Sequence, residues 1–138
     1  GTAPGPLARV ASGGELSRIS LAVKIVASAH AAAATQVFDE VDAGIGGRTA
    51  SAVGALLRKL AGSGQALCVT HLAQVAVFAD EQLRVVKADE EQRTTVRTDR
   101  LDAEGRVDEV ARMLGGQVSK SSRAHAAELL REAAQTRH

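Results

Sequence analysis

Two adjacent carboxylates and one histidine are the residues of this sequence whose types and spacing could carry out chemistry. Asp39 and Glu40 come directly after Thr35–Phe38, a short β-prone run. Neighbouring side chains of an extended chain point to opposite sides, so one carboxylate could hold Mg²⁺ through its waters while the other faces a nucleophilic water. A solvated acidic pair at the end of a strand is the commoner arrangement, and these two residues by themselves leave both interpretations open.

The histidine, His71, follows a second apolar run, Ala66–Thr70, which has the length and flanks of a buried parallel strand. The carboxyl ends of parallel strands meet at one edge of an α/β sheet, where such proteins place their chemistry. A lone histidine after a strand is more often structural than catalytic. Its expected position at the same edge as Asp39 and Glu40 favours a part in the same site.

A helix start that could receive an anion lies at Ser12-Gly13-Gly14-Glu15. Ser12 suits the N-cap, and Glu15, three residues later, completes a capping box. Gly13 and Gly14 would let a phosphate approach the backbone, where the unpaired N–H groups of a helix N-terminus favour a negative charge. A capped helix without any ligand explains the same residues, so both interpretations stay open here.

The spacing of the apolar residues predicts an α/β fold. A long amphipathic helix is expected from Glu15 to about Ala34, followed by the strand that ends at Phe38. After a loop that contains Gly44, Gly46 and Gly47, we expect helix 49–60, strand 66–70, helix 72–78, hairpin strands 83–88 and 94–100, helix 107–114 and helix 122–134.

This order of elements predicts parallel strands flanked by helices, with a small β-hairpin as an antiparallel addition. Two parallel strands are few for so many helices, so we expect a domain that is incomplete by itself. Residues 1–10, with Pro4 and Pro6 among glycines, are expected to be a linker or a truncated end, and residues 11–138 the domain.

The composition limits the classes of function. Lys and Arg number 17 against 16 Asp and Glu, and a net charge of +1 predicts no surface that tracks nucleic-acid phosphates. Phe38 and Phe78 are the two aromatic residues, too few for a base-stacking platform. The single cysteine, Cys68, excludes an internal disulfide and fits a reducing compartment. No stretch is apolar enough to span a bilayer, so we expect a soluble, cytoplasmic protein without a membrane partner.

Other site templates do not fit this sequence. Thr49 stands where a dinucleotide-binding loop needs its third glycine, and the four histidines are too dispersed for a zinc site. Gly115–Ser121 comes nearest to the phosphate-binding pattern G-x-x-x-x-G-K-[ST]. Ser119 replaces the glycine required before Lys120, however, and no strand precedes the segment. A helix-breaking turn with a solvated lysine explains it better.

The order of the motifs resembles the C-terminal lobe of an ABC/SMC-type ATPase head. The signature motif, Walker B, the D-loop and the switch histidine are similar to Ser12–Glu15, Val37–Glu40, Asp42 with the glycines after it, and Val69–His71. Glu15, where transporters usually have glutamine, favours the SMC and DNA-repair branch. Three further segments resemble the RecN family, the SMC-like bacterial ATPases of double-strand-break repair: Val41–Gly47, Ala111–Gly116 and His125-Ala126.

This resemblance implies a role for each matching residue. Asp39 would support Mg²⁺, Glu40 would polarise the attacking water, and His71 would contact the γ-phosphate of ATP. The resemblance implies that the remaining residues contact a second head. In this family the signature loop touches ATP held by the opposite head, and the D-loop crosses the interface between the heads. The matching residues here are Ser12, Gly13, Gly14, Glu15 and Asp42. Gly46 replaces the aspartate that closes the D-loop in many relatives.

The resemblance also implies partners. They are the N-terminal lobe of the same head, a second head in an ATP-dependent dimer, and DNA through the full-length protein, with a location at the nucleoid. The sequence has no Walker A lysine motif, so we expect the chain by itself to bind and hydrolyse no appreciable ATP. Two alternatives stay open: a fragment of an ABC transporter nucleotide-binding subunit, and a non-catalytic interaction lobe.

Overall fold

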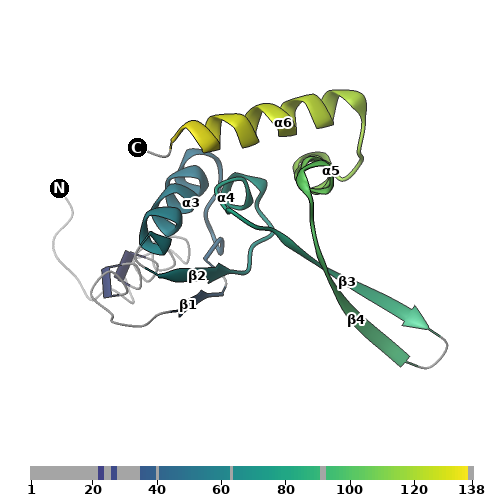
Figure 1. Cartoon of the computed structure of the whole chain (residues 1–138), viewed down its shortest axis with the longest axis horizontal. Helices are drawn as coiled ribbons and strands as arrows, with labels where there is room; N and C mark the ends of the chain where they lie inside the picture. The colour runs from purple at the N-terminus through teal and green to yellow at the C-terminus, as the bar shows by residue number, and fades with distance from the viewer. Residues whose placement is uncertain are drawn as a thin grey trace, which may run out of the picture. The chain divides into compact units, whose positions relative to one another are not determined.

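The computed structural model describes residues 22–23, 26–27, 35–39, 41–62, 64–90 and 93–136. The chain divides into two compact units, Gly1–Thr70 and His71–His138. The labelled elements in Figure 1 are, in chain order, β1 (Thr35–Phe38), α3 (Gly47–Ala61), β2 (Gln65–Cys68), α4 (Ala73–Ala76), β3 (Leu83–Glu90), β4 (Arg93–Arg100), α5 (Ala103–Gly115) and α6 (Lys120–Gln135).

The first unit contains a parallel strand pair joined by a helix. β1 pairs with β2 in a register that runs from Thr35 opposite Gln65 to Phe38 opposite Cys68. α3 connects the two strands and packs against β2 (Figure 1). Its buried residues recur at steps of three and four, so a single stripe of the helix is buried; they are Ala50, Val53, Gly54 and Leu57. The predicted parallel arrangement is therefore confirmed.

The two faces of this strand pair differ in burial. Phe38 is 4% exposed, whereas its neighbour Val37 is 69% exposed on the opposite face of β1. Leu67, which lies opposite Val37 in the register, is 47% exposed, and Val69 just after β2 is 62% exposed. One face of the pair thus presents three large aliphatic side chains to solvent.

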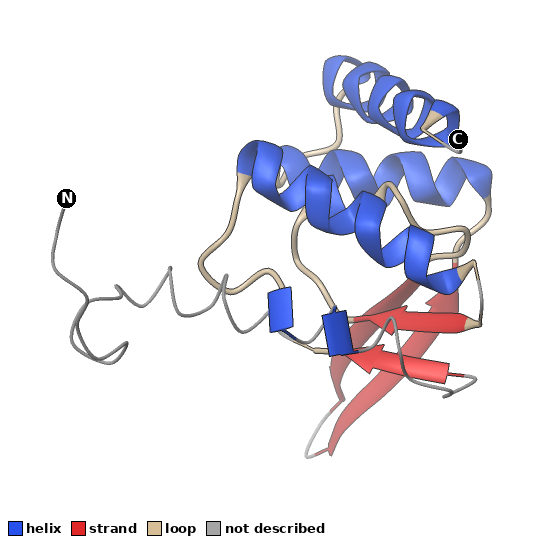
Figure 2. Cartoon of the chain, turned by 90° about the vertical axis from the view of Figure 1, so that its left-hand side faces the viewer, coloured by secondary structure: helices blue, strands red, loops and turns tan. Residues whose placement is uncertain are grey.

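The second unit packs α4, α5 and α6 around a small apolar core (Figure 2). The core is alanine-rich, which lets the helices approach closely; its buried residues are Ala73, Val77, Val110, Ala111, Ala126 and Ala133. β3 and β4 form the predicted antiparallel hairpin, with Leu83 opposite Arg100. The hairpin extends away from α5 and α6 of the same unit in Figure 1, and three of its aliphatic side chains are exposed: Leu83, Val85 and Val96.

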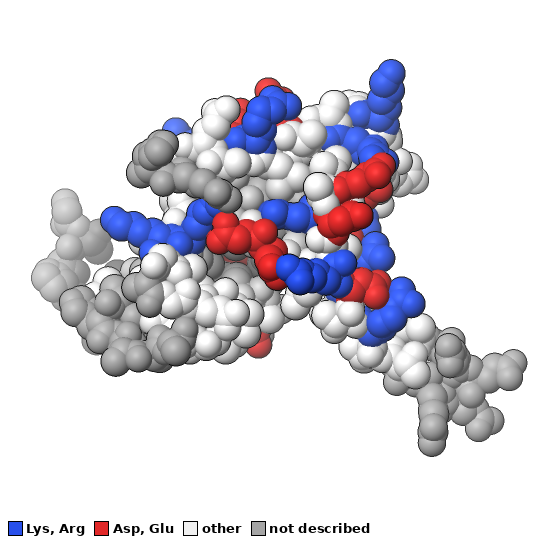
Figure 3. Space-filling model, in the orientation of Figure 1, with Lys and Arg blue, Asp and Glu red and all other residues white. Residues whose placement is uncertain are grey.

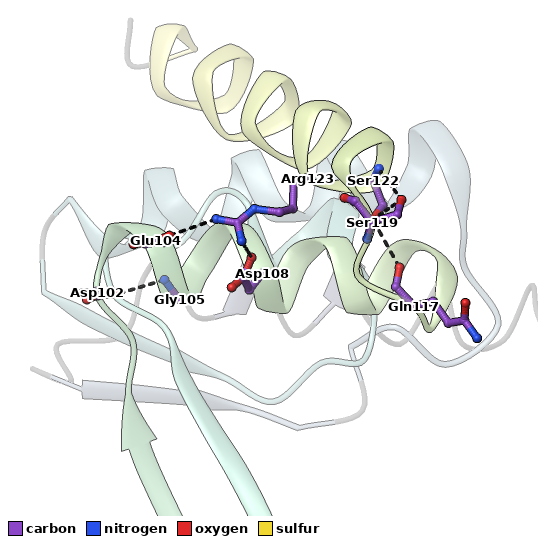
Figure 4. A network of polar contacts seen from close by, with 8 residues as sticks. All are labelled: Asp102, Glu104, Gly105, Asp108, Gln117, Ser119, Ser122 and Arg123. Atoms are coloured by element: carbon purple, nitrogen blue, oxygen red, sulfur yellow. Dashed lines mark hydrogen bonds and ion pairs between the residues drawn. The ribbon is translucent and has the colours of Figure 1, made fainter.

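Arg123 of α6 ties that helix to α5. Its guanidinium lies 3.1 Å from a Glu104 carboxylate oxygen and 2.9 Å from Asp108 Oδ1 (Figure 4). The Glu104 side chain is 78% exposed, and those of Arg123 and Asp108 are 40% and 41% exposed, so water partly screens the ion pairs and they add only modestly to stability. They fix the approach of the two helices more than they stabilise the unit.

Side-chain caps set the starts of both long helices in this unit. The amide of Gly105 donates to Asp102 Oδ1 over 2.7 Å at the start of α5. Ser119 and Ser122 form a reciprocal capping box at the start of α6, drawn in Figure 4. The apolar spacing predicts later starts, at residues 107 and 122. The observed helices begin at Ala103 and Lys120 because the caps satisfy the first amides of an additional turn.

The remaining boundaries differ by a few residues from those predicted. α3 is longer than the predicted helix 49–60, and α4 is shorter than the predicted helix 72–78. Of the predicted N-terminal helix only residues 22–23 and 26–27 are described, and these are helical. Within the described ranges, no helix combines the length and the apolar character needed to cross a membrane.

Candidate functional site

The candidate site lies at the carboxyl-terminal edge of the β1–β2 pair. The amide of Val69 donates to the carbonyl of Phe38 over 2.9 Å, which extends the ladder by one bond beyond the last residue of β2. Asp39 and Thr70 follow directly on the two strands, and Asp39 is exposed. The parallel register therefore brings the acidic end of β1 and the residues after β2 to the same edge, as the sequence predicts.

Asp42 faces inward at this edge. It is 6% exposed, and its Oδ2 accepts a hydrogen bond of 2.6 Å from the Thr70 hydroxyl. The carbonyl of Asp42 accepts from the amide of Ile45 over 3.3 Å, which closes a turn. Gly44 lies in that turn with φ of 71°, a conformation that residues with a Cβ rarely adopt. The Asp42 side chain is thus held within its own unit.

The thiol of Cys68 reports the electrostatics of the same edge. Its pKa is raised from an ordinary 9.0 to about 11, first by burial and then by the negative charges of Asp42 and Asp39. Two carboxylates near a half-buried thiol disfavour the thiolate. Burial and these charges therefore keep Cys68 in its thiol form at neutral pH.

The other predicted site residues are placed less completely. His71 is exposed and is the first residue of the second unit, joined to Thr70 by its peptide bond. Glu40 lies outside the described residues. So do the four residues of the predicted signature loop, which are Ser12, Gly13, Gly14 and Glu15. The structure brings together Asp39, Asp42 and Thr70 and leaves the rest as expectations from the sequence.

The carboxylate at this edge is a type of ligand that Mg²⁺ would require from the protein. Among the described residues, no group of three or more metal-binding side chains gathers in one place. Mg²⁺ in phosphate-transfer sites is bound by one or two carboxylates, and substrate phosphates and waters complete its shell. An exposed carboxylate such as Asp39, at the end of a strand, can serve as one such ligand.

Charges of both signs are interspersed over the face of the molecule drawn in Figure 3. On the hairpin, Arg97 and Arg84 both contact Asp99, at 2.8 Å and 3.4 Å. The carboxylates neutralise these cations locally. This face accordingly resembles a mixed, solvated surface, in agreement with the net charge of +1.

Thr70 is the site residue that sequence reasoning missed. The spacing treats it only as the last residue of an apolar strand, whereas its hydroxyl binds the carboxylate of Asp42. A signal was present, because polar side chains that follow two adjacent parallel strands are expected to meet. The direction of a side chain in a turn has no periodicity, so Asp42 could not be paired with Thr70 from the sequence.

Known proteins share sequence similarity with this chain over most of its length. No family model matches the chain. It is 51% identical over 126 residues to the DNA repair protein RecN of Vibrio cholerae, 50% over 129 residues to that of Streptomyces coelicolor, and 52% over 126 residues to that of Mycobacterium leprae. These matches cover 91%, 93% and 91% of this chain but 23%, 23% and 21% of the relatives, so the chain spans less than a quarter of their length.

A solved structure from work on ATP-driven dimerization and DNA-stimulated activation of SMC ATPases is also similar. The TM-score is 0.66 at 20% identity, over 80% of this chain and 66% of that chain. The sequence similarity confirms the resemblance to RecN, and the structural similarity confirms the α/β fold class.

Proposed function

Because the chain is similar to RecN over more than nine-tenths of its length, we propose that it supplies the C-terminal half of an SMC-like ATPase head. That head would bind and hydrolyse ATP in DNA double-strand-break repair and recombination. The observation that carries the proposal is the parallel β1–β2 pair, which is followed by Asp39 on one strand and, two residues after the other strand, by Thr70 and then His71. Phosphoryl transfer needs charged groups at fixed positions more than it needs covalent chemistry.

The roles of the residues follow from their positions and chemistry. Asp39 would hold Mg²⁺, which neutralises phosphate charge when it is bound. Glu40 would accept a proton from the attacking water, and His71 would donate a hydrogen bond to the terminal phosphate. The residues expected at a second head are the signature loop, Ser12, Gly13, Gly14 and Glu15, and the turn that begins at Asp42. Its backbone, more than its buried side chain, would lie at that contact.

The exposed aliphatic face of the first unit supports a partner lobe. Val37, Leu67 and Val69 are 69%, 47% and 62% exposed. Burying a fully exposed side chain of this size contributes about 1.5–3 kcal/mol, and covering the part that is still exposed here contributes a corresponding share. The relatives are more than four times as long as the matched segment, so they have the chain length to supply an N-terminal lobe. We propose that this lobe covers the face and contributes the Walker A lysine.

An ATPase assay on a hybrid protein tests the proposal. The matching 126 residues of Vibrio cholerae RecN are replaced by this chain, and turnover of Mg²⁺-ATP is measured. Loss of a general base typically costs at least about a hundredfold, so Glu40→Gln should lower kcat by that factor or more. Glu128→Gln removes one exposed carboxylate on α6 and should leave kcat unchanged.

Two results would contradict the proposal. One is turnover by the 138-residue chain alone that Glu40→Gln abolishes, since the chain would then be a complete enzyme. The other is a hybrid whose turnover does not respond to Glu40→Gln. Co-expression with an N-terminal RecN lobe should also raise the thermal midpoint of this chain, and an unchanged midpoint would count against the covered face.

A further inference from the structure

The hydrogen bond between Thr70 and Asp42 joins two segments that lie 28 residues apart in the sequence. At 2.6 Å it has the short distance of an O–H group that donates to a carboxylate, a class of bond stronger than those between neutral groups. Asp42 is 6% exposed, so water does not readily replace the hydroxyl. Removing the Thr70 hydroxyl would leave a buried carboxylate oxygen without this donor, which is costly.

Both ends of the bond are held by the backbone. On one side, Asp42 begins the turn that its carbonyl closes with the amide of Ile45. On the other side, the amide of Val69, one residue before Thr70, donates to the carbonyl of Phe38 across the strand pair. The side-chain contact therefore adds an attachment between the segment after β1 and the segment after β2.

Thr70 is also the last residue before His71. The side chain of Thr70 is held by Asp42, and the residue before it, Val69, is held by a backbone hydrogen bond. Few backbone conformations are therefore open to Thr70, and this limits the positions available to the next residue. We propose that Asp42 is a positioning residue, whose carboxylate holds the Thr70 hydroxyl and so fixes the point of the backbone from which His71 continues. This inference rests on the proposed ATPase function for its consequence, but the constraint on His71 can be measured without activity.

The first test is nuclear magnetic resonance on the ¹⁵N-labelled 138-residue chain. Thr70→Val keeps the shape of the side chain and removes the donor. It should move the amide signal of His71 and speed its hydrogen exchange by at least roughly tenfold, the factor expected when a bond to a charged group is lost. Thr70→Ser restores the donor and should return both values. Thr98→Val makes the same change at an exposed position of β4 and should alter neither.

The signals of α3 show whether the first unit of each variant is folded. If Thr70→Val unfolds the first unit, Asp42→Asn gives the second reading, since its amide oxygen still accepts from Thr70 without the charge. A smaller displacement of the His71 signal is then expected. A His71 signal and exchange rate that are the same in the folded Thr70→Val variant and the unaltered chain would overturn the inference.

The second test uses the hybrid RecN. Small displacements of a reacting group reduce turnover by up to about a hundredfold, so Thr70→Val should lower kcat at least roughly tenfold. The KM for ATP should stay within about twofold, because His71 is only one of the groups that would contact ATP. Thr70→Ser should rescue kcat. Full kcat in Thr70→Val refutes the positioning role, whereas a hybrid without turnover refutes the proposed function and leaves the His71 amide as the measure of the constraint.

Discussion

The reactivity of Cys68 provides a direct test of the electrostatics at the β1–β2 edge. Its pKa of about 11, against an ordinary 9.0, means that at pH 8 about one thiol in a thousand is ionised instead of about one in ten. The thiolate of a higher-pKa thiol is a better nucleophile, by roughly sixfold to tenfold for a rise of this size. Reaction with a disulfide reagent should therefore be at least about tenfold slower in the folded chain than in urea.

The assay follows the reaction of the thiol with a coloured disulfide between pH 7 and 12. The midpoint of the rate profile gives the pKa independently of how burial limits access of the reagent. Asp42→Asn removes the second-largest cause of the rise, so the midpoint should fall. It should stay above the ordinary value because burial, the largest cause, remains. Glu128→Gln removes an equal charge on α6 and should leave the midpoint in place.

Two results would refute this reasoning. A midpoint for the folded chain equal to that in urea would show that burial and the carboxylates do not act on the thiol. A midpoint unchanged by Asp42→Asn would show that the Asp42 charge lies too far from Cys68 to matter, and it would remove the electrostatic evidence that both flank the same edge.

Three further predictions concern stability. Leu57→Ala in α3, where the side chain is 5% exposed, should lower the free energy of urea unfolding by about 2–5 kcal/mol. Leu56→Ala, where the side chain is 40% exposed, should lower it far less. Equal losses would contradict the assigned buried face of the helix. Ser119→Ala removes the cap of α6 and should cost about 1 kcal/mol in the same measurement, with Ser121→Ala as the neighbouring control. Arg112 donates two hydrogen bonds to Glu109 and holds the pKa of that buried carboxyl below its ordinary 4.5. The stabilisation from this pair is therefore complete above pH 4.5, and it is lost as the pH falls through the lower pKa of the folded state. Glu109→Gln should flatten the acid limb of stability against pH, and a curve that keeps its slope would exclude this source.

Much of the fold could be predicted because its elements follow simple periodicities. In α3, the stripe of Val53 and Leu57 recurs at helical spacing, and the alternation in β1 separates Phe38 from Val37. The helix starts were predicted late because apolar spacing begins inside the helix, while the cap is a polar residue before it. Asp102 and Ser119 are ordinary capping residues that the spacing does not weigh.

The candidate site could be predicted only where it depends on the strands. The position of Asp39 follows from the end of β1 and needs no side-chain detail. The inward direction of Asp42 depends on a turn whose shape comes from Gly44 and the bond to Ile45. No pattern of residue types specifies that turn, so the contact with Thr70 emerges only in three dimensions.

The pairing of the strands sets the order in which the chain can fold. β3 and β4 are joined at one end, with Glu90 opposite Arg93, so their ladder can close from the turn outward at little cost in chain entropy. β1 and β2 pair residues 30 positions apart, as in Thr35 and Gln65, so closing this pair costs more chain entropy than closing the hairpin. In refolding of the whole chain we expect the hairpin to form early and the edge that carries Asp39 and Asp42 to be completed late, which leaves that edge exposed longest to proteases and to aggregation.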